Sequence, residues 1–212
     1  MWDRRAVTFP AGPLFVAAFG DSDRALWAAL RVTAVVFLAA LTAAAAQVSI
    51  PLPFTPVPLT LQPVVVLIGG AVLGPRLGMS SQVLYLGAGV LGLPVFAASA
   101  VLPQGAARLL GPTGGYLLSY PVAAFVTGWL ASRGFDRRYF TSVLAMVAGL
   151  AIILATGVVW LMVFTPAAGG RMSTALQLGL YPFVVADLAK VCIAAAILPA
   201  LWRFTGLGRS SR

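Results

Sequence analysis

Long apolar runs that carry almost no charge are the feature of this sequence that most restricts its fold. Six such runs occur, at about residues 25–46, 61–74, 79–96, 116–131, 140–164 and 176–202. Runs of roughly 18 mostly apolar residues are typical of membrane-spanning helices, and these runs lack the alternation that a membrane β-barrel requires. Of all residues 60% are hydrophobic and 9% are charged, against about 25% charged in soluble domains. We therefore predict an all-α integral membrane protein with six transmembrane helices.

The arginines predict the orientation of these helices, because cytoplasmic loops carry an excess of Lys and Arg. The loops at one side hold only Arg108 and Arg171. The other loops and both chain ends hold ten arginines, namely Arg4, Arg5, Arg24, Arg76, Arg133, Arg137, Arg138, Arg203, Arg209 and Arg212. Both termini are therefore expected in the cytoplasm. The chain is expected to form one membrane domain, residues 1–212, made of a cytoplasmic segment at 1–24, a six-helix bundle at 25–202 and a cytoplasmic tail at 203–212.

Several other classes of protein do not fit the composition. The net charge is +9, but the arginines form no cluster with aromatic residues, so we expect no nucleic-acid partner. The sequence has no histidine and a single cysteine, Cys192, so we expect no intrachain disulfide, no metal and no cofactor. No apolar core followed by an A-x-A step marks a cleavable signal peptide near the N-terminus. The stretch GPTGG at 111–115 lacks the lysine of a nucleotide loop, so ATP binding is not expected.

A stiff apolar segment, QVSIPLPFTPVPLTLQ at residues 47–62, interrupts the helical material. Its four prolines are Pro51, Pro53, Pro56 and Pro58, and it contains no charge. Proline opposes helix and pushes the preceding residue toward extended backbone. A plain surface connection would be richer in Ser, Asn and charged residues. We therefore predict that this proline segment is an external lid over a mostly apolar ligand, formed with Pro51, Phe54, Pro56 and Pro58.

Asp187 and Lys190 are the candidate binding residues, since Asp187 is the only acid inside a predicted span. The two residues are three apart and therefore share a helix face. Ionisable groups within a membrane are costly and usually functional, although a mutual ion pair that only neutralises itself is the alternative. Lys190 lies 13 residues before Arg203, about 20 Å along a helix. In a core about 30 Å thick, this depth places the pair beneath the external proline segment.

Further candidates are weaker. Arg108 is an external arginine that suits a carboxylate, or is simply solvated. Tyr85 and Tyr116 are either ligand contacts or members of the aromatic belt at the membrane surface. Small residues four apart let another helix approach closely, and in the first span these are Ala39, Ala43, Ala40 and Ala44. Packing within the chain is the alternative for these alanines.

Taken together, five stretches resemble the BioY family, the biotin-binding S components of energy-coupling-factor (ECF) transporters. They are AQVSIPLPFTPVPLTLQ, GPRLG, LYLGAGVLGLPVFA, GPTGGYLLSYPVAAFVTGWL and YPFVVADLAK. The resemblance covers about residues 34–196, and the combination of the proline segment with GPTGGY and DLAK is specific. One departure is the stretch AASAVLPQGAAR, which is longer and less glycine-rich than the matching region of many family members.

The resemblance implies high-affinity binding and uptake of biotin across the cytoplasmic (inner) membrane of a bacterium, by a chain that is not an enzyme. Asp187 and Lys190 match the family's Asp-x-x-Lys that contacts biotin. We assign six residues to biotin binding: Asp187, Lys190, Arg108, Tyr116, Tyr85 and Gln62. The implied partners are a membrane coupling protein and two ATPase subunits, for which the first-span alanines are the candidate docking surface.

Two other functions stay open from the residues alone. A stand-alone carrier coupled to an ion gradient would use Asp187 to carry a proton. An intramembrane enzyme is disfavoured, because the sequence offers no histidine, no second intramembrane carboxylate and no nucleophile–base pair.

Overall fold

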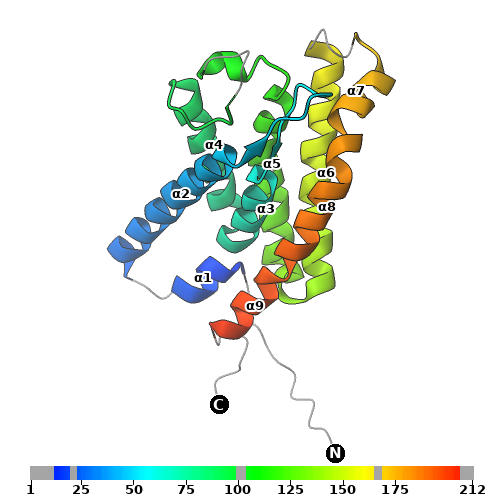
Figure 1. Cartoon of the computed structure of the whole chain (residues 1–212). Helices are drawn as coiled ribbons and strands as arrows, with labels where there is room; N and C mark the ends of the chain where they lie inside the picture. Colours follow the sequence, from blue (N-terminus) through cyan, green and yellow to red (C-terminus); the bar gives the residue numbers. More distant parts are fainter. Residues whose placement is uncertain (1–11, 20–22, 99–103, 165–168, 206–212) are drawn as a thin grey trace, which may run out of the picture.

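The protein is a helical bundle with a short hairpin at one end (Figure 1). This computed structural model describes residues 12–19, 23–98, 104–164 and 169–205. Two strands, β1 (Ser49–Ile50) and β2 (Leu59–Thr60), pair antiparallel, with Ser49 opposite Thr60. The short 3-10 helices are η1 (Ala106–Arg108) and η2 (Phe135–Arg137). The α-helices are α1 (Leu14–Phe19), α2 (Arg24–Gln47), α3 (Gln62–Leu73), α4 (Pro75–Val90), α5 (Gly114–Ser132), α6 (Tyr139–Phe164), α7 (Met172–Gly179), α8 (Tyr181–Ala195) and α9 (Ile197–Phe204).

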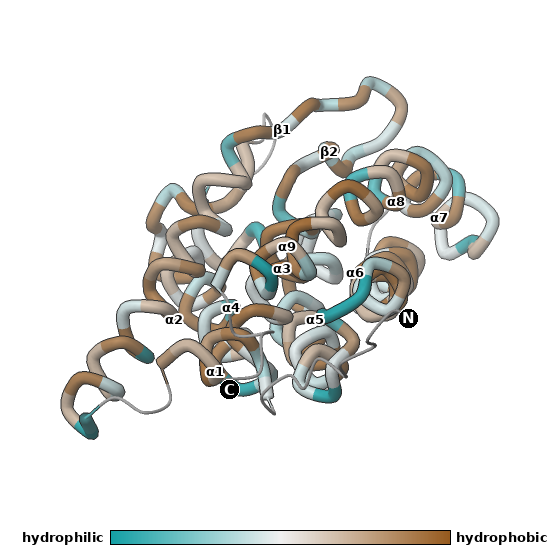
Figure 2. Tube along the Cα trace, turned by 90° about the horizontal axis from the view of Figure 1, so that it is seen from below, coloured by the Kyte–Doolittle hydropathy of each residue, from teal (hydrophilic) through white to brown (hydrophobic). Residues whose placement is uncertain are grey.

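The outer surface is that of a membrane protein. Large apolar side chains stand outward on the long helices, as on α2, where Phe37 is 66% exposed, and on α8, where Ile193 is 75% exposed. Figure 2 shows hydrophobic residues along α2, α6 and α8 and a hydrophilic connection between α5 and α6. Within the described residues, the helical segments long and apolar enough to cross a membrane are Arg24–Gln47, Tyr139–Val163 and Tyr181–Phe204, the last of which is α8 and α9 together.

The first five predicted spans coincide with α2 to α6 to within a few residues. The largest difference is in α4, which begins at Pro75 rather than at residue 79 and ends at Val90 rather than at residue 96. Proline is favoured in the first turn of a helix, where its missing N–H removes no helical hydrogen bond. Helix α1 was not predicted from the sequence.

The sixth predicted span is wrong as a single continuous helix. The structure divides it into α7, α8 and α9, with breaks at Leu180 and Ala196. Pro182 follows the first break and Pro199 follows the second. A proline cannot donate its share of the helical hydrogen bonds and clashes with the preceding turn, so the chain restarts a helix near each proline.

Glycines let α3, α4 and α5 pack at backbone contact. A Cβ added to Gly128 on α5 would lie 2.6 Å from the carbonyl oxygen of Gly70 on α3. A Cβ added to Gly70 would lie 2.5 Å from the carbonyl oxygen of Ala124. The apolar core next to this contact is supplied mainly by α3, α5, α6 and α8, and includes Val66, Leu67, Ala123, Ala124, Met146, Leu150, Ile153 and Val191. This tight packing fixes the helices on which the site is built.

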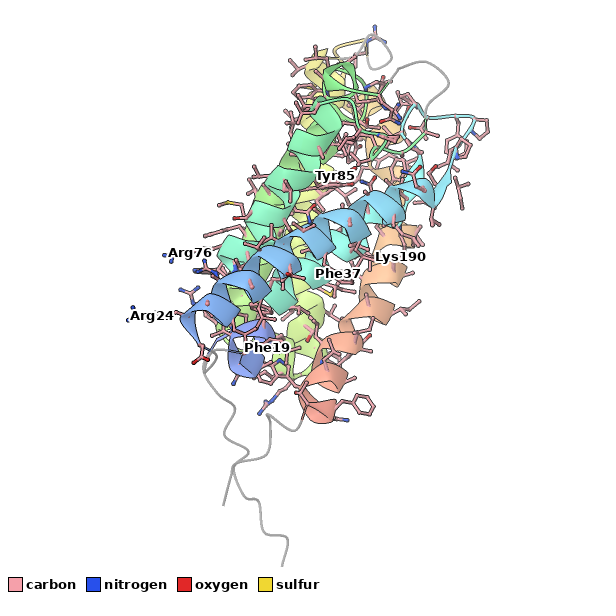
Figure 3. The ribbon with its side chains drawn as sticks, turned by 90° about the vertical axis from the view of Figure 1, so that its left-hand side faces the viewer. Phe19, Arg24, Phe37, Arg76, Tyr85 and Lys190 are labelled. Atoms are coloured by element: carbon pink, nitrogen blue, oxygen red, sulfur yellow. The ribbon has the colours of Figure 1, made fainter. Side chains whose placement is uncertain are left out.

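The two ends of the bundle differ in charge. The β1–β2 hairpin and α7 lie at one end, and α1 and α9 lie at the other (Figure 1). Arg24 and Arg76 both lie toward the end away from the hairpin (Figure 3). Of the ten arginines assigned to the cytoplasm, Arg4, Arg5, Arg209 and Arg212 lie outside the described residues.

Candidate functional site

A cavity of about 460 Å³ lies beneath the hairpin. This volume is within the range of small-molecule sites, about 300–1,000 Å³. Most of its lining is apolar and comes from the proline segment, the loops at 96–98 and 108–113, and the helices α5, α6 and α8. Its lining residues include Leu52, Thr55, Val57, Leu59, Thr60, Gln62, Pro63, Phe96, Arg108, Thr113, Tyr116, Leu117, Tyr120, Ile153, Leu154, Phe183 and Asp187.

Residues of the proline segment line this cavity; that the segment acts as a lid stays a prediction. Pro51, Pro56 and Pro58 line the cavity. Phe54 does not, and is 61% exposed at the turn of the hairpin. The hydroxyl of Thr55 donates a 2.7 Å hydrogen bond to the carbonyl oxygen of Leu178 on α7. The hairpin is therefore fastened at its turn as well as at its base.

Asp187 presents the acidic group of the cavity. It lies on α8, is only 4% exposed and forms an ion pair with Lys190, as the spacing of the two residues predicts. Lys190 is not among the residues that line the cavity. Its ammonium also donates a 2.8 Å hydrogen bond to the carbonyl oxygen of Thr60 in β2. Lys190 thus joins α8 to the base of the proline segment, and Figure 3 shows it on α8.

Gln62 and Tyr85 form a hydrogen-bonded pair at the cavity wall. Gln62, at the start of α3, lines the cavity, whereas Tyr85 on α4 does not. The Gln62 side-chain amide donates to the Tyr85 hydroxyl at 2.6 Å, and that hydroxyl donates to the carbonyl oxygen of Val95 at 3.3 Å. Tyr85 is therefore placed to orient Gln62, one contact behind the cavity surface.

Arg108 lines the cavity from η1 and is only 5% exposed. Its Nε atom is buried and has no hydrogen-bond partner among the described residues. Burial lowers the pKa of the Arg108 guanidinium from its ordinary value. The neighbouring loop is held by Trp160 on α6, whose indole N–H donates to the carbonyl oxygen of Gly111 at 2.9 Å. A buried guanidinium with an unused donor is suited to an incoming anion.

Tyr116 lines the cavity and fixes the break between α7 and α8. Its hydroxyl donates a 2.7 Å hydrogen bond to the carbonyl oxygen of Gly179. Its ring lies 6.4 Å from that of Phe183, centroid to centroid. Phe183 and Tyr120 line the cavity but were not assigned to the site from the sequence. Each lies four residues from an assigned residue on the same helix, Asp187 and Tyr116 respectively, and that spacing could have indicated both.

The four alanines of the first span do not share one surface. Ala39 is buried within the core and Ala43 is partly buried against it. Ala40 and Ala44 are exposed. Ala39 and Ala43 therefore serve packing within the chain, so only Ala40 and Ala44 are accessible to a partner.

Comparisons with known proteins agree on one family. The model of the BioY family matches residues 21–206. A relative from Pyrococcus horikoshii, described as a probable biotin transporter BioY, is 40% identical over 173 residues, which are 82% of this chain and 96% of the relative. The biotin transporter BioY of Thermotoga maritima is 42% identical over 159 residues, 74% of this chain and 87% of the relative.

A solved structure shares the fold. It is a crystal structure of the S-component for biotin from an ECF-type ABC transporter, which matches with a TM-score of 0.75 and 25% sequence identity. The match covers 86% of this chain and 95% of the other.

Proposed function

The chain belongs to the BioY family, and from that premise we propose that it is a membrane transporter component that binds biotin in the cavity beneath the proline segment. The observation that carries the proposal is the burial of Asp187 in a mostly apolar cavity of about 460 Å³ covered by that segment. The protein is accordingly a transporter component and not an enzyme, the S component of an ECF-type system.

The cavity suits the chemistry of the biotin ring system. The ureido ring carries two N–H donors and one carbonyl acceptor, and a buried carboxylate is the strongest acceptor for such donors. Asp187 is the only acid among the lining residues. Lys190 is held by Asp187 and by the carbonyl oxygen of Thr60. We expect it to bind the ureido carbonyl only after it releases Thr60, and otherwise to hold Asp187 in place.

Arg108 is our candidate for the biotin carboxylate. It lines the same cavity, is buried, and offers an Nε–H with no partner among the described residues. A carboxylate would supply that partner and would reduce the cost of burying the guanidinium. Gln62, oriented by Tyr85, and Tyr116 complete the proposed polar contacts, while Leu52, Val57 and Phe183 supply apolar walls.

We further propose that residues 1–212 form one domain with six transmembrane helices, in the cytoplasmic membrane of a bacterium. Helices α2, α3, α4, α5, α6 and the α8–α9 unit would span the membrane, with both termini in the cytoplasm. The arginine distribution supports this orientation. After replacement of Cys192 by Ala, an impermeant thiol reagent should label Phe54→Cys in intact cells and spare Ser132→Cys. The reverse labelling would refute the orientation.

The sequence contains no ATPase motif, so we propose that the energy for uptake comes from partners. The proposed partners are an ECF coupling protein with two ATPase subunits. Ala40 and Ala44 provide an exposed small-residue face on α2 to which a partner helix can approach closely. If a stand-alone carrier driven by an ion gradient were correct instead, uptake would be abolished by an uncoupler and would persist without any ATPase.

Equilibrium titration of biotin into detergent-purified protein tests the binding proposal. Saturable binding of one biotin per chain is expected. Asp187→Asn should weaken it, whereas Asp23→Asn, the same change at an exposed site on the far end of α2, should not. Absence of saturable biotin binding by folded wild-type protein would refute the assignment.

A further inference from the structure

A second cavity, a groove of about 470 Å³, lies between α6, α7 and α8. We call it the α6–α8 groove. These helices lie on the side of the bundle away from α2 (Figure 1). All of its lining residues are apolar: Val147, Leu150, Ala151, Leu154, Ala155, Val158, Val159, Met172, Leu176, Leu180, Val184 and Leu188. A hollow this free of polar groups cannot bind a polar metabolite, since nothing in it would replace that molecule's hydrogen bonds to water.

The dimensions of the groove match one acyl chain. Along α6 the groove runs from Val147 to Val159, which is 12 residues or about 18 Å. On α8, Val184 and Leu188 are four residues apart and continue the same stripe. The hydrocarbon core of a bilayer is about 30 Å thick, so each leaflet contributes about 15 Å. The groove therefore has the length of the hydrocarbon layer of a single leaflet.

A positive charge lies at one end of the groove. Arg171 directly precedes Met172, which lines the groove at the start of α7. Its side chain is exposed and makes no ion pair with any described residue. Of the acids among the described residues, Asp187 is paired with Lys190, Asp136 with Arg137, and Asp23 lies at the start of α2. None of these described acids pairs with Arg171, so its charge is available to an anion from another molecule.

We propose that the α6–α8 groove binds one acyl chain of an anionic phospholipid, whose phosphate pairs with Arg171. In the orientation proposed above, on which this assignment to a leaflet rests, the lipid belongs to the outer leaflet. The groove requires an apolar chain and the adjacent arginine requires a negative charge. Together they select an anionic amphiphile, because a soluble anion lacks the apolar chain and a neutral lipid lacks the charge. Because an acyl chain is already out of water in the membrane, the phosphate contact decides which lipid stays.

The bound lipid would also support the biotin cavity. Leu154 lines both the α6–α8 groove and the cavity beneath the proline segment. An acyl chain behind Leu154 fills the space into which α6 and α8 could otherwise relax. Occupation of the groove should therefore hold Phe183 and Asp187, both on α8, in their positions at the biotin cavity.

Native mass spectrometry of the full chain in detergent tests the proposal, with phosphatidylglycerol and phosphatidylcholine of identical acyl chains as probes. Wild-type protein should retain one phosphatidylglycerol with about fivefold preference over phosphatidylcholine, as expected for about 1 kcal/mol from one arginine near an anionic headgroup. Arg171→Gln should abolish the preference and Arg171→Lys should keep most of it. Arg76→Gln, an exposed arginine at the other end, is the matched control.

A second variant tests the groove itself. Ala155→Phe should fill the groove and remove the retained lipid, whereas Val36→Phe on the exposed face of α2 should not. Equal retention of the two lipids by wild-type protein, or unchanged lipid retention in folded Ala155→Phe, would overturn the proposal. A wild-type dimer that Ala155→Phe dissociates would also overturn it, since a second copy would then occupy the groove. Biotin titration of the same samples tests the biotin assignment independently, so failure of the lipid proposal can be distinguished from failure of the biotin assignment.

Discussion

Replacement of Asp187 by Asn is the sharpest test of how the site recognises its ligand. Asn keeps the size of the side chain and one carbonyl oxygen, but it loses the charge that Lys190 neutralises. Asp187 is 4% exposed in a mostly apolar cavity, so water cannot substitute for the lost acceptor. Hydrogen bonds to charged groups contribute about 1.5–3 kcal/mol. Biotin affinity should therefore fall by about ten- to a hundredfold.

The structure predicts a different outcome for Lys190→Met. This change removes the ion pair to Asp187 and the hydrogen bond to Thr60. An unpaired charge left in a buried site costs about 3–5 kcal/mol of folding stability, and the base of the proline segment loses one anchor. Asp187→Asn also leaves a charge unpaired, but Lys190 is 19% exposed at its side chain and keeps its hydrogen bond to Thr60. Lys190→Met should therefore reduce folded yield and thermal stability more than Asp187→Asn does. Affinity is compared only among variants that elute as a single species in size-exclusion chromatography.

The double variant Asp187→Asn with Lys190→Met separates recognition from charge neutralisation. It contains no unpaired charge, so it should fold better than Lys190→Met alone. If the pair binds the ureido group, calorimetric titration should detect at least a hundredfold loss of biotin affinity, with Asp23→Asn as the unaffected control. Near-normal affinity in the folded double variant would refute the reasoning and would show that the two residues only neutralise each other.

Three further perturbations test the lid and the opposite end of the bundle. Changing Pro56 and Pro58 together to Gly should weaken biotin binding about fourfold to thirtyfold by restoring entropy that closure must remove; unchanged affinity in a titration would argue against a closing lid. Thr55→Val removes the hydrogen bond from the lid to α7 and should speed biotin dissociation about fivefold, and an unchanged rate in a chase experiment would exclude a latch. Burial raises the pKa of Asp136 from 3.8 to about 6, so the folded protein holds the Asp136 proton more tightly than the unfolded chain does. Binding of this proton contributes at most about 3 kcal/mol to folding stability. The contribution is fully present below pH 4 and is lost as pH rises through 6. Asp136→Asn, which keeps an acceptor for the indole N–H of Trp202, should flatten thermal stability over this pH range, and a persistent slope would contradict the assignment.

The sequence predicted the helices well wherever local pattern controls them. The first five apolar runs became α2 to α6, because a backbone without water must satisfy its own hydrogen bonds and does so as helix. The same argument failed at the C-terminal run. There the prolines at 182 and 199 divide the run into three helices. Hydropathy does not show that a proline lacks the N–H needed for a helical hydrogen bond.

The candidate site was predicted less completely than the fold. Asp187, Arg108, Gln62 and Tyr116 line one cavity although they come from four separate elements. The sequence could not indicate that Lys190 would turn toward Thr60, nor that Tyr85 would lie behind Gln62. Both outcomes depend on which element lies opposite each helix face.

The sequence by itself therefore determined the membrane class, the positions of most helices, the extended proline segment and the shared face of Asp187 and Lys190. Each of these follows from residue type and spacing along the chain. Only the tertiary structure decided that Ala39 faces inward while Ala40 faces outward, and that α6, α7 and α8 leave a groove between them. In a helix that is apolar on every side, periodicity does not distinguish the lipid-facing side from the packed side, so close contact between helices must decide it.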